Sequence, residues 1–220
     1  MSSPLVSAII AVHNGDRYIR EAIDSVRAQS YQPIEIIVID DGSTDSTVEV
    51  CRAVGPDVQV IQQANQGAGA ARNLGVERAT GEFIALLDHD DVWLPDKIAR
   101  QLAAFEDNIQ TGVCFTHVVE FAEGLEDSVP KPGLISSTLM MRRRLYLELG
   151  GFETERFAGE MIRLMTMAID QGCTQVILPE VLVKRRLHEG HKSIDRTRYQ
   201  QYVGAVRDVL QRRRNGASNL

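Results

Sequence analysis

The sequence predicts an α/β fold with a doubly wound sheet that is mixed but mainly parallel. Three near-continuous apolar runs, Leu5–Val12, Ile34–Asp40 and the run that begins at Phe83, resemble strands buried on both faces of a parallel sheet. Between the first two lies a segment with helical periodicity, whose apolar face is formed by Ile19, Ala22, Ile23 and Val26. Because strands and helices alternate through about residue 106, we expect right-handed β–α–β units.

Local signals place the elements of the first half. Ser46 followed by Glu49 fits a capping box at a helix start. Pro95 stands near the first turn of a helix, where its missing N–H costs nothing, and Gly81 ends the preceding helix. Together these signals predict strands over 5–12, 34–40, 58–63 and from 83, and helices over 16–30, 46–54, 68–78 and 94–107.

The second half is less regular, and Pro179 and the pair Gly150–Gly151 are its clearest breaks. Here the pattern predicts a strand over 112–121, a polar loop over 123–133, a short strand and a helix within 137–152, a helix over 159–172, two short strands around Pro179, and an amphipathic helix over 198–214.

Composition limits the class of protein. A chain of 220 residues with 44% apolar residues is long enough for one sizeable core. No apolar run approaches the ~20 residues that span a membrane, and the first residues lack the basic start of a signal peptide. The three cysteines are far apart and form no CxxC pair, which favours reduced thiols in a cytoplasmic protein over a structural zinc site.

The net charge of −6 hides an uneven distribution. From Lys184 onward there are ten Lys or Arg and three Asp or Glu, a net of +7, so the remainder carries −13. A basic tail can serve a phosphate site, an anionic membrane or a partner surface, or it can be a solvated helix.

Polar side chains follow three of the predicted strands at the point where each strand ends. These are His13 with Asn14, the stretch Asp40–Ser43, and the run Asp88, His89, Asp90 and Asp91. In open α/β sheets, ligands bind at the carboxyl ends of the strands. Each stretch alone could have a purely structural role, as an Asx turn or as solvated acidic residues at the rim of the sheet. Three such stretches at one edge of the sheet indicate a ligand-binding site.

Crowded carboxylates indicate a divalent cation. Mg²⁺ or Mn²⁺ binds carboxylate oxygens together with the phosphates of a substrate, and it removes the repulsion between the acids. No GxxxxGK[ST] motif occurs, and no GxGxxG follows the first strand. The absence of both motifs weighs against a P-loop hydrolase and against an NAD enzyme.

Two long stretches carry a resemblance to a known family. "VSAIIAVHNGDRYIREAIDSVRAQSYQPIEIIVIDDGSTDST" and "NQGAGAARNLGVERATGEFIALLDHDDVWLPDKI" resemble an inverting family 2 glycosyltransferase of GT-A fold, a Rossmann-like doubly wound sheet. "GGFETERFAGEM" and "VLVKRRLHEGHKSID" are similar to the acceptor half of that family. The resemblance implies a glycosyltransferase domain over 1–197, with a nucleotide-sugar-binding half (1–106) and an acceptor half (107–197), followed by a basic tail (198–220).

The resemblance also implies roles on the donor side. Asp41, with Asp40 beside it, would bind uracil or an equivalent base, and Arg72 would reach the base or the diphosphate. Asp88 and Asp90 match the DxD pair, with Asp90 as a direct ligand of Mn²⁺ or Mg²⁺ and Asp88 as its companion, whereas Asp91 would cap the next turn. The remaining residues expected around the nucleotide sugar are Ala11, Val12, His13, Asn14, His89, Trp93 in the sugar pocket, and Arg186 and His188 on a loop near the leaving phosphates, with His188 facing the metal.

The acceptor side departs from the family pattern. That pattern ends in an aspartate, the base that deprotonates the acceptor, but here the residues are Gly159, Glu160 and Met161. Three interpretations stay open: Glu160 serves as the base, the acceptor is more acidic and needs less help, or the base lies elsewhere or turnover has been lost. Glu153 and Glu155 are further acidic candidates.

We therefore expect a metal-dependent transferase that moves a sugar from a nucleotide-diphosphate donor, first of all a UDP-sugar, with inversion. The alternative is a nucleotide-sugar-binding module that has lost catalysis and acts through a partner, and a nucleotidyltransferase fits less well. The acceptor (a glycan, a lipid-linked molecule or a peptide) is not readable. We expect no nucleic-acid partner, and a cytoplasmic protein whose basic terminal helix touches the inner face of a membrane or forms a homodimer.

Overall fold

The computed structural model describes residues 3–124, 126–154 and 160–188, apart from the side chain of Glu160. The expected terminal helix over 198–214 lies outside these residues. The elements are β1 (Val6–Val12), α1 (Ile19–Arg27), β2 (Ile34–Asp41), α2 (Thr47–Val54), β3 (Val58–Gln63), α3 (Ala68–Arg78), β4 (Phe83–Asp88), β5 (Val92–Trp93), α4 (Lys97–Asp107), β6 (Thr111–Phe121), β7 (Lys131–Gly133), the 3-10 turn η1 (Ser136–Thr138), β8 (Met140–Arg142), α5 (Arg143–Glu148), α6 (Glu160–Asp170) and β9 (Thr174–Arg186).

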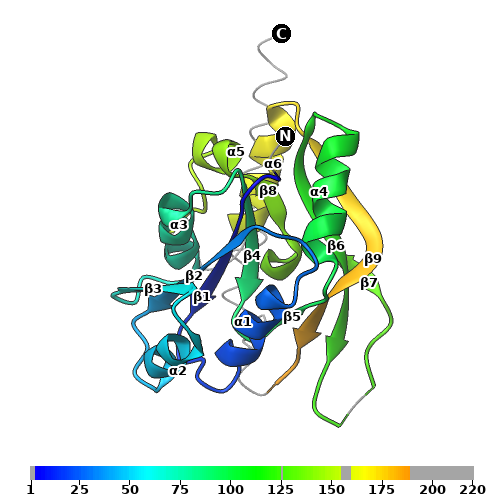
Figure 1. The fold of residues 1–220 in the computed structure, drawn as a ribbon. Helices are drawn as coiled ribbons and strands as arrows, with labels where there is room; N and C mark the ends of the chain where they lie inside the picture. Colours follow the sequence, from blue (N-terminus) through cyan, green and yellow to red (C-terminus); the bar gives the residue numbers. More distant parts are fainter. Residues whose placement is uncertain (1–2, 125, 155–159, 189–220) are drawn as a thin grey trace, which may run out of the picture.

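One mixed sheet organises the molecule (Figure 1). Its strand order is β3-β2-β1-β4-β8-β6-β9-β5, with β7 paired to β6. The strands of the first half, β1 to β4, are parallel to one another, as the sequence predicts, and β8 then joins the sheet antiparallel to β4 and β6. Strands β6 and β9 are parallel to each other. The sheet therefore combines parallel and antiparallel pairs and is mixed.

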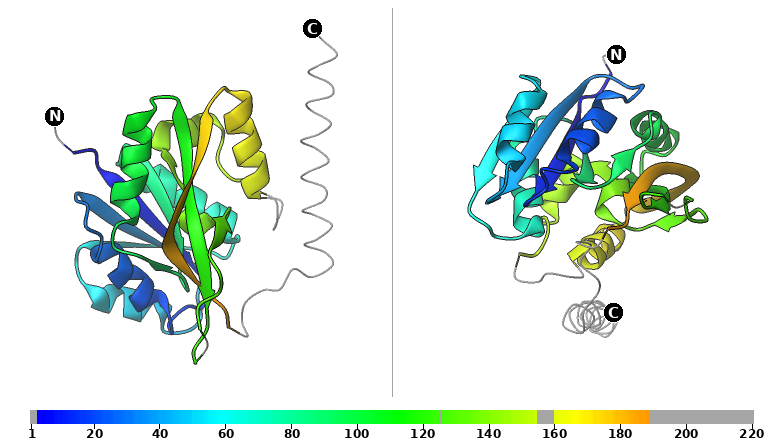
Figure 2. Two further views of the ribbon diagram at one scale, coloured as in Figure 1. Left: turned by 90° about the vertical axis from the view of Figure 1, so that its right-hand side faces the viewer. Right: turned by 90° about the horizontal axis from the view of Figure 1, so that it is seen from below.

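Helices cover both faces of the sheet, as Figure 2 shows. Strand β1 is buried throughout, and its residues alternate between two cores. Ile10 and its neighbours on one face pack against α1, α2 and α4, whereas Ile9 and Ala11 pack with α3, α5 and α6 on the other. The apolar runs of the sequence therefore form strands buried on both sides.

The second half differs from the prediction in two places. The two strands expected around Pro179 are one strand, β9, and the polar loop over 123–133 contains the short strand β7. Opposite β6, the pairing jumps from Leu178 to Val181, so Pro179 lies in a bulge where its missing N–H breaks no ladder bond.

The predicted capping box at α2 does not form. The helix begins at Thr47, but the side chain of Ser46 makes no capping hydrogen bond. Asp45 Oδ1 instead accepts the Thr47 N–H at 3.0 Å. The helix start is as predicted, and its first free N–H group is satisfied by a different residue.

The cysteines of the described chain are free, and two of them are fully buried. Burial raises the pKa of the Cys51 thiol to about 12 and that of Cys114 to about 11. Within residues 3–124, 126–154 and 160–188, no helix is both long and apolar enough to cross a membrane.

Candidate nucleotide-sugar site

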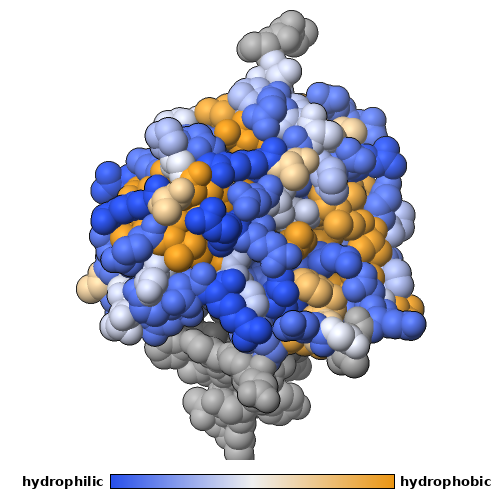
Figure 3. All heavy atoms as spheres, turned by 60° about the horizontal axis from the view of Figure 1, so that its bottom comes forward, coloured by the Kyte–Doolittle hydropathy of each residue, from blue (hydrophilic) through white to orange (hydrophobic). Residues whose placement is uncertain are grey.

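The register of the parallel strands brings the three polar strand ends together. Asp88 at the end of β4 is paired with Ala11 of β1, and Asp40 of β2 is paired with Val12. The loops that follow β1, β2 and β4 therefore leave the sheet side by side at one edge. Figure 3, with the bottom of Figure 1 turned forward, shows a band of hydrophilic side chains across this face of the molecule.

Asp88 is held by an arginine from α3. Arg72 Nη2 lies 2.6 Å from Asp88 Oδ1, and the side chains of Arg72 and Asp88 are 10% and 33% exposed. The Arg72 guanidinium also lies over the ring of Phe152, 5.7 Å from its centroid. This partly buried ion pair places a cation beside the acidic turn.

Asp90 lies against the end of β9 and the residues just after it. Its Oδ2 is 2.9 Å from His188 Nε2, and its carbonyl oxygen accepts a hydrogen bond from Arg186 Nε at 3.0 Å. The Arg186 guanidinium lies between the rings of Tyr18 and Phe121, 4.7 Å and 4.4 Å from their centroids. The structure thus brings together Asp90, Arg186 and His188, which the sequence could associate only through the family resemblance.

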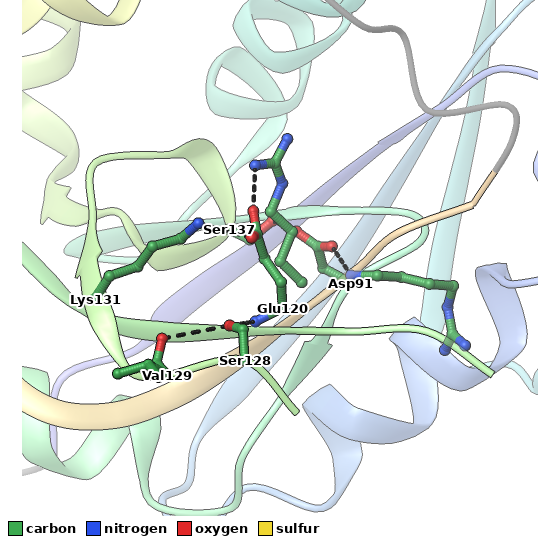
Figure 4. A network of polar contacts seen from close by, with 8 residues as sticks. Asp91, Glu120, Ser128, Val129, Lys131 and Ser137 are labelled. Carbon is green, nitrogen blue, oxygen red and sulfur yellow. Dashed lines mark hydrogen bonds and ion pairs between the residues drawn. The ribbon is translucent and has the colours of Figure 1, made fainter. Parts of the chain in front are cut away.

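Asp91 points into the protein. It is 2% exposed, and its two carboxylate oxygens accept hydrogen bonds from Ser137 Oγ at 2.5 Å and from the Arg186 N–H at 3.0 Å (Figure 4). Burial, together with the neighbouring charges of Asp88 and Asp90, raises the pKa of Asp91 to about 8. Its backbone N–H donates to the carbonyl oxygen of Asp88 at 3.1 Å. Its carboxylate was expected to cap the turn that follows, but it binds Ser137 and Arg186, which are distant in sequence.

The loops after β1 and β2 are tied to each other by side chains. His13 Nδ1 lies 2.9 Å from the carbonyl oxygen of Asp41, and Asn14, in the left-handed region at φ 52°, accepts the Thr44 N–H at 2.8 Å. His13 and Asn14 are themselves exposed. They therefore stand where a ligand could reach them.

Asp40 and Asp41 are 1% and 3% exposed. Asp41 accepts hydrogen bonds from the N–H groups of Gln66 and Gly67, both at 2.8 Å, and so fixes the glycine-rich turn that leads into α3. Asp40 accepts the Ser43 N–H at 3.3 Å. In this structure, both carboxylates shape the loops around the expected base position.

Trp93 takes a different position from the expected one. Its ring is 2% exposed, its indole N–H donates to the carbonyl oxygen of Ser137 at 2.8 Å, and Lys97 Nζ lies 4.0 Å from its ring centroid. The ring belongs to the core beneath the acidic turn and does not line an open sugar pocket. His89, on the acidic turn, packs against Gly15, where a Cβ atom would lie 2.4 Å from the imidazole.

The acceptor side is only partly described. Glu160 is the first residue of α6, but its side chain and all of Glu155 lie outside the described residues. Met161 is partly buried and packs against an apolar core, and Glu153 Oε2 lies 3.9 Å from Arg163 Nε. The position of the family's aspartate thus faces the core in this chain.

A carboxylate and an imidazole meet at Asp90 and His188, and both groups are of a kind that binds Mn²⁺. Asp90 Oδ2 lies 2.9 Å from His188 Nε2, the length of a hydrogen bond or ion pair. The pair offers two ligands, and Asp88 is engaged by Arg72. In the described part of the chain, no three His, Cys, Asp or Glu side chains form a metal-binding group, so substrate oxygens or water would complete the coordination.

Ser137 and Tyr18 contact the expected site, although no sequence pattern gives either residue a role. Ser137 binds Asp91, and the Tyr18 ring lies 5.0 Å from that of His188. Ser137 stands in an ordinary "ISST" stretch with no motif. Only the tertiary fold reveals it.

Curated relatives are glycosyltransferases. The chain is 47% identical over 100 residues to an uncharacterized glycosyltransferase of Rickettsia prowazekii. The aligned stretch covers 46% of this chain and 31% of that protein. It is 41% identical over 128 residues to an uncharacterized glycosyltransferase of Nostoc, and this aligned stretch covers 56% of the chain and 39% of the relative. The matched stretch spans between 15% and 42% of the length of the curated relatives.

Solved structures and a family model complete the comparison. TarS (residues 1–349) of S. aureus in complex with UDP-GlcNAc has a TM-score of 0.75 at 23% identity, covering 93% of this chain and 65% of TarS. The mannosyltransferase PcManGT of Pyrobaculum calidifontis, in complex with GDP-Man and Mn²⁺, has a TM-score of 0.76 at 22% identity, covering 94% and 65%. These likenesses confirm the predicted GT-A fold. The model of the family described as glycosyl transferase family 2 matches residues 7–170, so the chain belongs to that family.

Proposed function

We propose that the chain is the catalytic domain of a metal-dependent, inverting glycosyltransferase that uses a nucleotide-diphosphate sugar, with a UDP-sugar as the first candidate. The observation that carries this proposal is that Asp90 of the acidic turn and His188 after β9 meet at the carboxyl edge of the sheet, with Asp90 Oδ2 2.9 Å from His188 Nε2. The nucleotide sugars bound to TarS and PcManGT, and the Mn²⁺ of PcManGT, support it.

The donor would lie across the strand ends. His13 and Asn14 are exposed where the base is expected, and the buried Asp40 and Asp41 hold the loops around it. Arg72, beside Asp88, supplies positive charge toward the diphosphate. A divalent cation bound by Asp90 and His188 would stabilise the charge that develops on the leaving diphosphate.

The chain must also supply a base. Inversion by direct displacement requires the acceptor hydroxyl to lose its proton as it attacks the sugar carbon from the face opposite the leaving group. Glu160, at the start of α6, is our candidate for the residue that takes this proton. A specific observation favours a second function: Met161 packs against the core where the family has its aspartate, as expected of a nucleotide-sugar-binding module without turnover.

One assay separates these functions. The purified protein is mixed with UDP-Glc, UDP-GlcNAc, UDP-Gal or GDP-Man, with and without MnCl₂, and release of the nucleoside diphosphate is measured. We expect MnCl₂-dependent release with one donor, its loss in Asp90→Ala, and unchanged release in Asp107→Ala, whose side chain is exposed at the end of α4. Loss of release in Glu160→Ala with retained UDP binding would support Glu160 as the base.

The opposite results are equally informative. UDP binding to the wild-type protein without release from any donor would favour the binding module. Release that is equal with EDTA and with MnCl₂ would exclude the metal-dependent mechanism. If no nucleotide raises the melting temperature of the protein, the donor site itself is refuted.

A further inference from the structure

Ser137 lies beneath the acidic turn and contacts it at two points. The residue is 0% exposed and lies in the short turn η1 between β7 and β8. Its Oγ accepts a hydrogen bond from the Asp88 N–H at 3.1 Å and donates one to Asp91 Oδ2 at 2.5 Å. One hydroxyl thus binds both ends of the turn that carries Asp90.

Asp91 extends this contact to the end of β9. Its second oxygen, Oδ1, accepts the Arg186 N–H at 3.0 Å (Figure 4). His188 follows Arg186 by two residues. The chain of contacts therefore runs from Ser137 through Asp91 to Arg186, which is 95 residues further along the sequence than Asp91. Asp90 precedes Asp91 and His188 follows Arg186 by two residues, so the pair expected to bind the metal is attached to both ends of the Asp91–Arg186 contact.

The support under Ser137 is itself fixed. The Trp93 indole N–H donates to the Ser137 carbonyl oxygen at 2.8 Å, and Gln101 Nε2 donates to that of Thr138 at 2.9 Å. The side chains of Trp93 and Gln101 are buried, so water does not compete for these bonds. Because these bonds fix Ser137, its hydroxyl holds the Asp88 N–H and the Asp91 carboxylate in defined positions.

We propose that Ser137, acting through Asp91, is a positioning residue that sets the separation between Asp90 and His188 and thereby the affinity for a divalent cation with a nucleoside diphosphate. The part of this inference that concerns the ligand rests on the proposed function, whereas the part that concerns the geometry does not. Loss of the Ser137 hydroxyl leaves Asp91 Oδ2 and the Asp88 N–H without their buried partner. Asp91 Oδ1 keeps the Arg186 N–H, but its carboxylate is no longer held from η1. We therefore expect the turn to shift relative to the end of β9.

Ser7 provides a matched control at the opposite end of the sheet. It is also 0% exposed, donates to a carboxylate (Glu35 Oε1, 2.5 Å) and accepts a backbone N–H (Gly81, 2.9 Å). Ser137→Ala and Ser7→Ala therefore remove the same kinds of bond and should lower the melting temperature alike. Ser137→Cys, which keeps the side-chain volume but bonds weakly, is a second variant in case Ser137→Ala does not fold.

Two measurements test the inference on each variant. The first is amide hydrogen exchange at Arg186 in the protein without ligand. The second is calorimetric titration of UDP in MnCl₂. We expect Ser137→Ala or Ser137→Cys to exchange about tenfold faster at Arg186 and to bind UDP with MnCl₂ about tenfold more weakly, which corresponds to the loss of one buried hydrogen bond. Ser7→Ala should change neither beyond its general loss of stability.

Equal exchange at Arg186 in the folded Ser137 and Ser7 variants would overturn the inference, and so would unchanged UDP affinity in a folded Ser137 variant of a protein whose wild type binds UDP. If the wild-type protein binds no UDP, the proposed function fails. The exchange at Arg186 then decides on its own whether Ser137 positions the end of β9.

Discussion

The side chain of Asn73 binds both backbone polar groups of Phe152. Its Nδ2 donates to the Phe152 carbonyl oxygen at 2.8 Å, and its Oδ1 accepts the Phe152 N–H at 2.9 Å. The same oxygen accepts a hydrogen bond from the Tyr146 hydroxyl at 2.6 Å. Helix α3, which carries Arg72, is thus fastened to the segment that leads toward α6, so the donor and acceptor halves share one anchor.

Replacing this anchor should cost stability. In Asn73→Ala, the Phe152 N–H and the Tyr146 hydroxyl lose their hydrogen bonds to Asn73, in a region where both residues are almost fully buried. We expect the free energy of unfolding to fall by about 2–4 kcal/mol, measured by urea denaturation. Asn108→Ala is the control, because Asn108 is exposed and accepts one local N–H. A loss in Asn73→Ala no larger than that in Asn108→Ala would contradict the anchor.

Close packing between α3 and β1 gives a second prediction. A Cβ at Gly75 would lie 2.4 Å from Ile9 Cγ2, whereas one at Gly69 in the same helix would meet its nearest atom at 3.6 Å. Gly75→Ala should lower the free energy of unfolding by about 1–3 kcal/mol through overpacking, despite the better helix propensity of alanine. Gly69→Ala should leave it unchanged or raise it by up to about 1 kcal/mol. Thermal denaturation of the two variants checks the contrast, and a stabilised Gly75→Ala would refute it.

The first half of the fold was predictable from sequence because its strands are buried on both faces. Such strands leave long apolar runs, and their polar ends stand out clearly, so the sequence alone places Asp88 and Asp90 at the sheet edge. In the second half, β9 runs through Pro179, and a local pattern reads a proline as a break. The bulge that accommodates it exists only because β6 lies alongside.

The side-chain roles that were missed depend on contacts distant in sequence. From its place in the sequence, Trp93 resembles a pocket residue. In the structure, its indole N–H donates to the Ser137 carbonyl oxygen and Lys97 Nζ lies over its ring. Likewise, Asp91 is one of three similar carboxylates in the sequence, and only Ser137 and the Arg186 N–H distinguish it. A motif identifies which residues are chemically able to act, but the burial that selects among them comes from tertiary packing.

Arg72 allows a test of the charge beside the acidic turn. In Arg72→Ala, Asp88 loses a cation 2.6 Å away, and the diphosphate loses a positive group, so we expect UDP to bind in MnCl₂ at least about tenfold more weakly by calorimetry. Arg142→Ala is the matched control. Arg142 also pairs with a carboxylate, Glu82 at 3.3 Å, and lies over a phenylalanine, but at the other end of β4. Equal UDP affinities in the two variants would show that Arg72 has only a structural role.

Lys97 is buried, and no carboxylate of residues 3–124, 126–154 and 160–188 forms an ion pair with it. It is 0% exposed, its Nζ donates to Gln101 Oε1 at 2.7 Å, and the face of Trp93 offsets part of the cost of burying the ammonium. Burial lowers the pKa of Lys97 from 10.5 to about 7. Between pH 7 and about 10.5, the unfolded chain therefore binds more protons here than the folded one, so this residue makes stability rise with pH across that window. Below pH 7 its destabilising effect is fully present.

Lys97→Met should remove this dependence. At pH 6 we expect the variant to be more stable than the wild type, by on the order of a few kcal/mol, because an apolar side chain of similar length replaces a buried ammonium. The advantage should shrink steadily at pH 7, 8 and 9, as the wild-type lysine loses its proton in the folded state. Urea denaturation at each pH measures the difference, and Lys131→Met, at an exposed lysine paired with Glu120, should show a difference that stays constant. If the difference for Lys97→Met were equally constant from pH 6 to 9, Lys97 would not change its protonation in the folded protein within that range.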